Sequence, residues 1–198
     1  MPVAALAVMI TVWEGVIVAS HASPLILPSP LAIVSACITH SRELTIETAF
    51  TMSEAVLGFL TGAVAAYLLA IVFLHSRSAE QAIMPFAVSL KSTPLVALAP
   101  ILVIWYGDGF VSKVVMSAMV SFWPVLVGGL RGLRAVTPES MALMDSLGAN
   151  RWQILWYLRV PSSLGYLFAS LKVSSSLAVV GAVIGELVGK VQLNLCYL

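Results

Sequence analysis

The amino-acid sequence predicts an all-α integral membrane protein, folded as a polytopic helical bundle. Of its 198 residues, 60% are hydrophobic and only 10% are charged. A soluble domain carries about 25% charged residues, so this chain has too few to cover a water-facing surface. The formal net charge is +1, which leaves no basic stripe for a nucleic acid. We therefore expect the lipid bilayer as a partner and no nucleic acid.

Five segments are long and apolar enough to be membrane spans, since a bilayer core needs about 20 such residues. They run approximately over residues 2–19, 48–74, 82–106, 114–130 and 164–188. We treat residues 1–198 as one transmembrane domain. In the second span, Gly58 and Gly62 form a G-x-x-x-G pattern, which predicts a close helix contact.

The linkers between these spans differ in character. The first contains Leu-Pro-Ser-Pro at residues 27–30, which predicts a rigid, non-helical turn followed by a polar stretch. Residues 76–81 and 107–112 form short linkers. The longest linker, residues 131–163, holds four arginines against two acids and is therefore expected to be cytoplasmic. Alternation of the spans then places the N-terminus in the cytoplasm.

The long linker is predicted to begin with a capped helix. Thr137 suits the N-cap, Pro138 the first helical position and Glu139 the positive end of the helix dipole. The helix can run to Leu147, and Gly148 suits the left-handed residue that ends it.

A second helix is predicted directly after the first. Asn150 and Gln153 have the spacing of a capping box, and Pro161 is expected to end the helix. Apolar residues recur at helical spacing on both helices, which predicts that something covers them. These residues are Met141, Met144 and Leu147 on the first helix, and Trp152, Leu155 and Trp156 on the second. They either pack on the chain's own helix ends or fit the groove of a partner.

The stretch PESMALMDSLGANRWQILWYLRVPSSLGYLFASLK, residues 138–172, resembles the cytoplasmic loop of bacterial ABC-importer permeases. Gly148 matches the glycine of that loop and Pro161 its downstream proline. LPSP after the first span, TPLVALAPILVIWYG at residues 93–107 and VVGAVIGELVG at residues 179–189 agree in order. The chain is most similar to the nitrate/sulfonate/taurine-type permeases. LMDSLGANRWQ and SSLAVVGAVIGE resemble the subgroup for thiamine-pyrimidine precursors and riboflavin-like compounds.

The chain also departs from the family pattern. The family's Glu-Ala-Ala triplet aligns with Ala142, Leu143 and Met144, so its acid is absent. Asp145 stands where a basic residue is usual. The family's last span is missing after Gly189, which indicates either a truncated or frameshifted copy or a diverged C-terminus. The resemblance thus implies the type I importer permease fold with five visible spans.

The resemblance implies a transport function that depends on other chains. Two permease chains would pair as a homodimer, an external binding protein would deliver the substrate, and a separate ABC ATPase dimer would bind ATP and Mg²⁺. The chain has no Walker-type loop of its own, so we expect no bound cofactor, no metal and no enzyme activity. Residues 131–163 would couple the permease to the ATPase. The candidate contacts in this loop are Glu139, Met141, Met144, Asp145, Leu147, Gly148 and Ala149.

The implied setting is the bacterial inner membrane, with a multi-pass chain. The implied substrates are a thiamine-pyrimidine precursor, a riboflavin-like compound, or a small anion such as a sulfonate or nitrate. Three alternatives remain: a secondary transporter, an intramembrane enzyme, and a truncated permease copy that does not transport. No Ser/His or metal-ligand constellation in the spans supports the enzyme.

Four charged residues within or near the spans are candidates for the translocation pathway: Lys91, Glu54, Lys172 and Glu186. Charges in a bilayer are costly and usually face a cavity or a partner. For Lys172 and Glu186, near the ends of the fifth span, snorkelling to the interface is favoured.

Lys91 is the strongest pathway candidate from sequence. It precedes the helix-disrupting Pro94 and Pro100, and irregular backbone at that depth is tolerated where it lines a cavity or is buried in protein. An anionic or carbonyl-rich substrate would suit Lys91. Alternatively, Glu54 pairs with Lys91 across two helices and neutralises both.

Overall fold

The computed structural model describes residues 2–20, 28–92 and 95–196, and these residues form helices without any strand. The chain divides into two units, Met1–Phe50 and Thr51–Leu198. The first unit holds α1 (Pro2–Ser20), α2 (Pro30–Thr39) and the beginning of α3 (Ser41–His75). The second holds the rest of α3 and all later elements, and it contains both sites analysed below.

Helix α2 replaces part of the polar stretch expected after the first span. The Ser29 side chain accepts a hydrogen bond from the Ala32 N–H at 3.2 Å, and Pro30 occupies the first turn. Pro28 and Ser29 are non-helical as predicted, but the prediction that the non-helical turn includes Pro30 is wrong. Pro30 begins a helix here because its fixed φ and missing N–H suit the first helical turn. Leu27 lies outside the described residues.

The second unit continues with α4 (Arg77–Ser92), α5 (Leu95–Tyr106), α6 (Phe110–Arg134), α7 (Pro138–Ser146), α8 (Arg151–Gln153), a π-helical turn η1 (Ile154–Arg159) and α9 (Val160–Cys196). The predicted span 82–106 is divided between α4 and α5, and residues 93–94 lie outside the described part. The predicted linker 76–81 is largely helical, because Ser76 alone separates α3 from α4.

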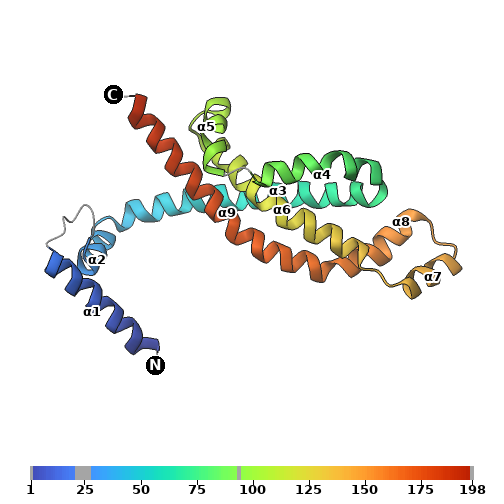
Figure 1. The fold of residues 1–198 in the computed structure, drawn as a ribbon, viewed down its shortest axis with the longest axis horizontal. Coiled ribbons are helices and arrows are strands. Elements are labelled where there is room, and N and C mark those ends of the chain that lie inside the picture. Colours follow the sequence, from blue (N-terminus) through green and yellow to red (C-terminus); the bar gives the residue numbers. More distant parts are fainter. Residues whose placement is uncertain (1, 21–27, 93–94, 197–198) are drawn as a thin grey trace. The chain divides into compact units, whose positions relative to one another are not determined.

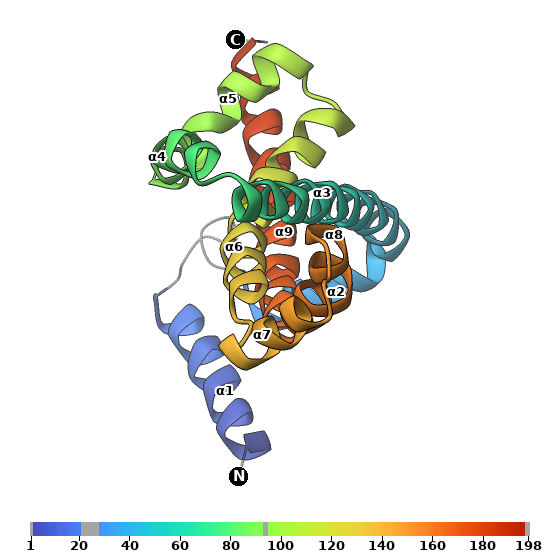
Figure 2. The same cartoon turned by 90° about the vertical axis from the view of Figure 1, so that its right-hand side faces the viewer.

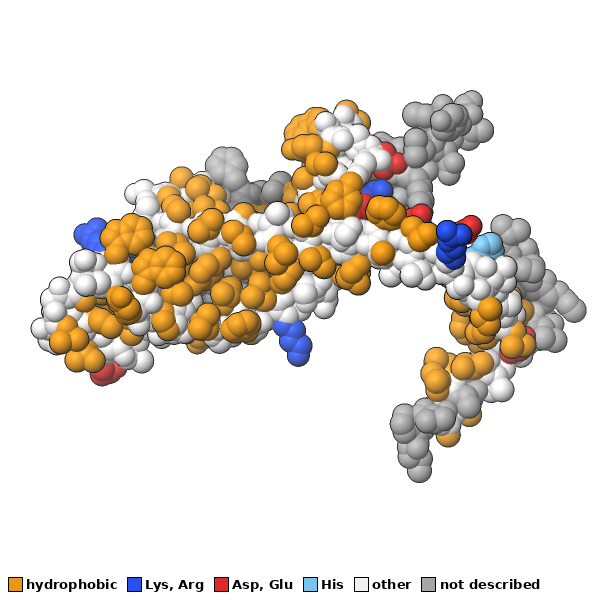
Figure 3. Space-filling model, turned by 180° about the vertical axis from the view of Figure 1, so that it is seen from behind, with side chains coloured by type: hydrophobic (Ala, Val, Ile, Leu, Met, Phe, Trp, Pro, Cys, Tyr) orange, Lys and Arg blue, Asp and Glu red, His pale blue; other side chains and the backbone are white. Residues whose placement is uncertain are grey.

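Three of the described helices are long and apolar enough to cross a membrane: Ser41–His75, Phe110–Arg134 and Arg151–Gly189. They contain the predicted spans 48–74, 114–130 and 164–188. Hydrophobic side chains cover much of the face of the second unit seen in Figure 3, and Lys and Arg are sparse on it. Such a surface fits contact with lipid rather than water.

Helices α6 and α9 form the centre of the second unit and lie side by side in Figures 1 and 2. Small residues and hydroxyls line their contact, as is usual between helices in membranes. The Ser174 hydroxyl donates to the Ser121 carbonyl at 2.6 Å, and the Ser117 hydroxyl donates to the Ala178 carbonyl at 3.0 Å.

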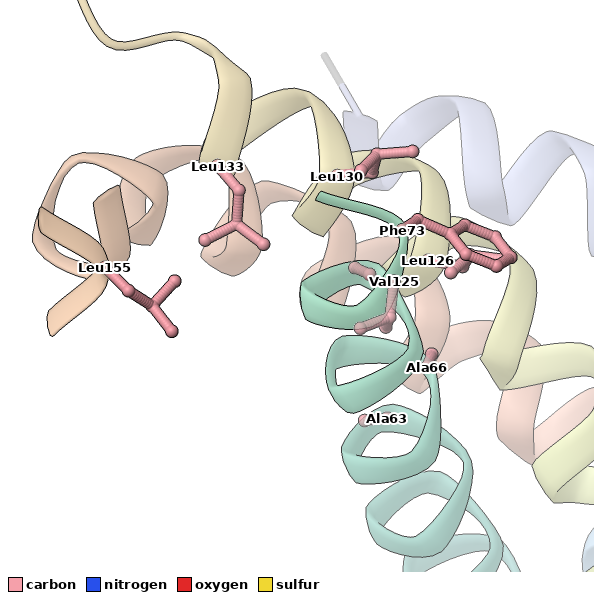
Figure 4. Close-up of a cluster of buried hydrophobic side chains, with 9 residues drawn as sticks. Ala63, Ala66, Phe73, Val125, Leu126, Leu130, Leu133 and Leu155 are labelled. Carbon is pink, nitrogen blue, oxygen red and sulfur yellow. The ribbon is translucent and has the colours of Figure 1, made fainter. Parts of the chain in front are cut away.

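Helix α3 packs closely on α6 through the predicted G-x-x-x-G pattern, which confirms a close helix contact there. A Cβ on Gly58 would lie 2.4 Å from the Ser117 Cβ, and one on Gly62 would lie 2.5 Å from the Ala118 carbonyl oxygen. Farther along α3, toward its C-terminal end, a buried cluster joins three elements (Figure 4). It consists of Ala63, Ala66 and Phe73 of α3, Val125, Leu126, Leu130 and Leu133 of α6, and Leu155 of η1.

The prediction that the second linker helix ends before Pro161 is wrong. The helix runs without interruption from α8 through η1 into α9. In η1 the Val160 N–H bonds to the Leu155 carbonyl, five residues back, instead of four. In an ordinary α-helix, the ring of Pro161 would clash with the carbonyl of the preceding turn. The wider turn directly before Pro161 shifts the hydrogen-bond register at this place, so the helix can continue. The Ser162 hydroxyl also donates to the Leu158 carbonyl at 2.7 Å.

Candidate functional site

The first candidate site is the segment between α6 and α9, which local sequence signals hold in a defined shape. The Thr137 hydroxyl accepts from the Ser140 N–H at 3.3 Å, and Pro138 begins α7. At the other end, the Asn150 side chain accepts from the Gln153 N–H at 2.9 Å. The side-chain amide oxygen of Gln153 accepts in return from the Asn150 backbone N–H at 2.8 Å. The predicted N-cap and capping box are both confirmed.

Gly148 ends α7 in the left-handed conformation, with φ of +67°, as predicted. The Gly148 N–H donates to the Asp145 carbonyl at 3.0 Å, and the Ala149 N–H donates to the Met144 carbonyl at 3.1 Å. This pair of hydrogen bonds is a Schellman motif, with Leu147 as the C-cap residue. Backbone hydrogen bonds close the end of α7, and the capping box closes the start of α8. Local hydrogen bonds therefore fix the joint between the two helices.

Gly148→Val is expected to weaken this joint by about 1 kcal/mol or more, because a β-branched residue is strained at positive φ. A Cβ at Gly148 would meet no atom within 4 Å, so the cost comes from the backbone and not from a clash. Thermal unfolding in detergent measures the effect. Gly165→Val in helix α9, also free of neighbours within 4 Å and without positive φ, serves as the control. Equal destabilisation by both variants would contradict the strained-joint explanation.

The apolar side chains of this segment divide between two directions. Leu155 is buried and belongs to the bundle's hydrophobic cluster. Arg159 holds the segment against α6: one guanidinium nitrogen donates to the Leu133 carbonyl at 2.9 Å, and another lies 3.9 Å from the Met141 sulfur. Both expected environments therefore occur, since part of the apolar surface packs on the chain's own helices and part does not.

The apolar side chains of this segment that face outward are grouped here under the name α7–α8 surface. It consists of Leu143, Leu147, Trp152, Trp156 and Tyr157, each at least 59% exposed. Trp152 also lies 6.1 Å, between ring centroids, from His75 at the end of α3.

The predicted coupling residues lie at different depths in this surface. Glu139, Asp145, Leu147 and Gly148 are exposed, whereas Met141, Met144 and Ala149 are half-buried. Prediction from helical spacing missed Leu143, because it does not share the spacing of Met141, Met144 and Leu147. The exposed aromatic Tyr157 was missed as well.

An ion pair ties α4 to the same end of α6. Two Arg134 guanidinium nitrogens donate to the two Glu80 carboxylate oxygens at 3.0 and 2.6 Å. The hydrogen bonds from Arg134 hold the pKa of the Glu80 carboxyl below its ordinary value of 4.5. Such bidentate geometry fixes the relative position of two helices better than a single contact.

This ion pair predicts a pH dependence. Since the pKa of Glu80 is lowered in the folded state, its stabilising contribution is complete above the ordinary value of 4.5 and disappears as the pH falls through and below it. We expect the difference in unfolding temperature between wild type and Glu80→Gln to shrink from pH 7 to pH 4. A difference that stays constant over this range would contradict the assignment.

The second candidate site is a charge cluster inside the bundle, around Glu54 of α3. The Glu54 side chain is 5% exposed, and one of its carboxylate oxygens lies 4.0 Å from the Lys113 Nζ of α6. Its other oxygen is buried without a hydrogen-bond partner. Glu186 of α9 and Asp108 of the α5–α6 turn are close enough to act electrostatically on Glu54, and Glu186 accepts a hydrogen bond from the Thr51 hydroxyl.

The structure thus brings two of the predicted pathway residues, Glu54 and Glu186, into one cluster. Among the described side chains, the cation beside Glu54 is Lys113. The side chain of Lys91 lies outside the described residues, so the Glu54–Lys91 pair stays a prediction. Sequence reasoning missed Lys113 and Asp108 because both lie at the boundary between a linker and a span, where charges are ordinary. Lys172 is exposed on α9 and is not part of the cluster.

Three apolar helices packed through small residues, with a capped exposed segment between two of them and charges inside the bundle, are typical of a polytopic membrane protein. Residues 58–195 match the family of binding-protein-dependent transport system inner membrane components, and the chain belongs to this family.

Similar curated proteins agree with this assignment. The chain is 34% identical to a riboflavin transport system permease protein of Chloroflexus aurantiacus, over 96% of this chain and 72% of that protein. It is 31% identical to a formylaminopyrimidine transport permease protein of Halalkalibacterium halodurans, over 91% and 72% of the two chains. A probable ABC transporter permease of Haemophilus influenzae is also 31% identical, over 95% and 77%.

Proposed function

We propose that this chain is the permease subunit of an ATP-driven importer and that its α7–α8 surface docks on a separate ATPase subunit. The observation that carries the proposal is a large, exposed apolar surface on a segment closed at each joint by hydrogen bonds. An exposed surface of this kind is typical of protein contacts, and a rigid segment can transmit the movement of a partner. The arginines that flank the surface support a cytoplasmic position for this segment by the positive-inside rule.

The other parts of the proposal follow from the family. A second copy of the chain completes the translocation path, an external binding protein delivers the solute, and ATP and Mg²⁺ are bound by the ATPase. The chain itself is neither an enzyme nor a cofactor-binding protein. We place it in the bacterial inner membrane with a cytoplasmic N-terminus. The names of the relatives support a riboflavin-like compound, a thiamine-pyrimidine precursor, or a sulfonate as the solute.

The test is co-purification with the ATPase. In the double variant Leu143→Ser and Leu147→Ser, we expect at least a tenfold loss of bound ATPase, since central apolar contacts each contribute about 2 kcal/mol or more. The control is Ala142→Ser, which introduces the same side chain on an exposed face of the same helix without removing a large apolar group. If wild type and double variant retain the ATPase equally, the α7–α8 surface is not the docking site. Solute uptake without any ATPase would instead indicate a secondary transporter.

A further inference from the structure

Helix α9 has two unlike faces in its middle turns. One face packs against α6 and consists of small residues: Ser170, Ser174, Ala178 and Ala182 are at most 9% exposed. The other face is not covered by the described residues and carries Lys172, Ser175 and Ser176. Residues three and four positions apart share a helix face, so the lysine and the two hydroxyls form one polar stripe.

The packing against α6 gives the depth of this stripe. Ser174 is hydrogen-bonded to Ser121, near the middle of α6, and Lys172 lies two positions away, or about 3 Å along the helix axis. The exposed Arg131 marks the nearest charged end of α6. Measured along the helix axis, Arg131 lies roughly 12 Å from the level of Lys172, and this distance exceeds the reach of a four-carbon lysine stem. The Lys172 side chain is therefore too short to bring its ammonium group to the interface by snorkelling.

Nothing in the described part of the chain neutralises Lys172. The ion pairs there involve other residues, and the Glu54 cluster already contains Lys113 as its cation. An unpaired charge at this depth is expensive in lipid and normally faces water or a partner. The lysine face of α9 is therefore not a lipid-facing surface.

A groove lies between α3 and α9 next to this stripe. It encloses about 340 Å³ and is lined by Met52, Val56 and Phe59 on the α3 side and by Ser175, Ser176 and Val179 on the α9 side. Apolar walls with a few hydroxyls are typical of sites for small solutes. Lys172 lies one helical turn from the two serines, toward the α7–α8 end.

We propose that Lys172, Ser175 and Ser176 line the translocation path and that Lys172 and Ser176 bind acceptor oxygens of the transported solute. The Lys172 ammonium and the Ser176 hydroxyl are hydrogen-bond donors, and the charge selects an anionic or carbonyl-rich group. The Ser175 hydroxyl donates to the Lys172 carbonyl at 2.9 Å, so it offers the path its oxygen as an acceptor. This inference rests on the proposed function as a permease subunit. It assigns the solute-binding role to α9 rather than to Lys91, and it leaves the Glu54 cluster as an internal ion-pair network.

The test measures water access and local charge without depending on the solute. In a background with Cys37→Ser and Cys196→Ser, Ser176→Cys is labelled in the assembled complex with two probes. These are the anionic 2-sulfonatoethyl methanethiosulfonate and its cationic trimethylammonioethyl analogue. We expect labelling by both probes, with the anionic-to-cationic rate ratio falling about tenfold on Lys172→Met and staying unchanged on Lys172→Arg. Val173→Cys, an exposed apolar position of α9 that does not line the groove, is the control and should react more slowly.

The outcomes separate the two proposals. A complex that assembles with its ATPase and imports solute, but leaves Ser176→Cys unlabelled, overturns this inference and leaves the proposed function intact. Labelling whose rate ratio does not change on Lys172→Met overturns the role of Lys172. Failure of the chain to bind any ATPase overturns the proposed function, whatever the labelling shows.

Discussion

Gly62→Ala is expected to destabilise the protein strongly, although it adds one methyl group to a helix. The new Cβ would lie 2.5 Å from the Ala118 carbonyl oxygen and 3.0 Å from the Ala118 Cα. Both are backbone atoms of α6 and cannot rotate away, so α3 and α6 must separate along their contact. Overpacking of this kind costs about 1–3 kcal/mol, and the loss of the contacts around it adds to that. The measurement is the unfolding temperature in detergent, together with the monodisperse fraction after extraction.

Gly165→Ala is the matched control for this prediction. Gly165 also lies within a helix, but a Cβ there would meet no atom within 4 Å. Alanine costs less backbone entropy than glycine in a helix, so this variant should be neutral or more stable by about 0.5–1 kcal/mol. If Gly62→Ala and Gly165→Ala behave alike, the α3–α6 contact is not as close as the structure has it.

Lys113→Met is expected to have the second large effect. Lys113 is the cation that the described residues place beside Glu54, with Glu186 and Asp108 nearby. Its removal leaves the buried Glu54 carboxylate, next to two half-buried acids, without this counter-charge. Breaking a buried ion pair by removing one partner costs about 3–5 kcal/mol, because the other charge stays desolvated. We expect reduced yield of folded protein and a lower unfolding temperature.

The double variant Lys113→Met with Glu54→Gln distinguishes a charge effect from a packing effect. Removing the Glu54 charge as well should recover part of the lost stability, so the two substitutions should not be additive. Lys113→Arg should retain most of the stability. The ion-pair explanation is contradicted if the two substitutions are additive. In that case the double variant is less stable than Lys113→Met by the full destabilisation that Glu54→Gln causes alone.

The fold class and the shape of the α7–α8 segment were both accessible from sequence. Thr137, Gly148 and Asn150 act on backbone groups within four residues of themselves, so the sequence pattern contains the whole interaction. The failure at Pro161 has the opposite cause. Whether a proline ends a helix depends on the preceding turn, and the π-helical turn η1 has no reliable sequence signal.

Sequence analysis singled out Glu54 and Glu186 as charges within or near the spans but missed Lys113 and Asp108. Lys113 lies near Glu54 because α3 and α6 cross through Gly58 and Gly62, and that crossing brings together residues far apart in sequence. Likewise, helical spacing predicted the apolar faces of α7 and α8 but not that Met141 turns inward to Arg159 while Leu143 turns outward.

The sequence by itself determined that this is an all-α membrane protein of an importer permease family, with a capped segment between the spans that form α6 and α9. These properties depend on composition, on hydrophobic length and on hydrogen bonds between neighbours in the chain. Tertiary structure alone decided which helices meet, which charge pairs with Glu54 and which face of α9 carries an uncovered lysine. These properties depend on contacts between residues far apart in sequence: the close approach of α3 and α6 brings Lys113 to Glu54, and the packing of α9 on α6 decides which α9 face stays uncovered.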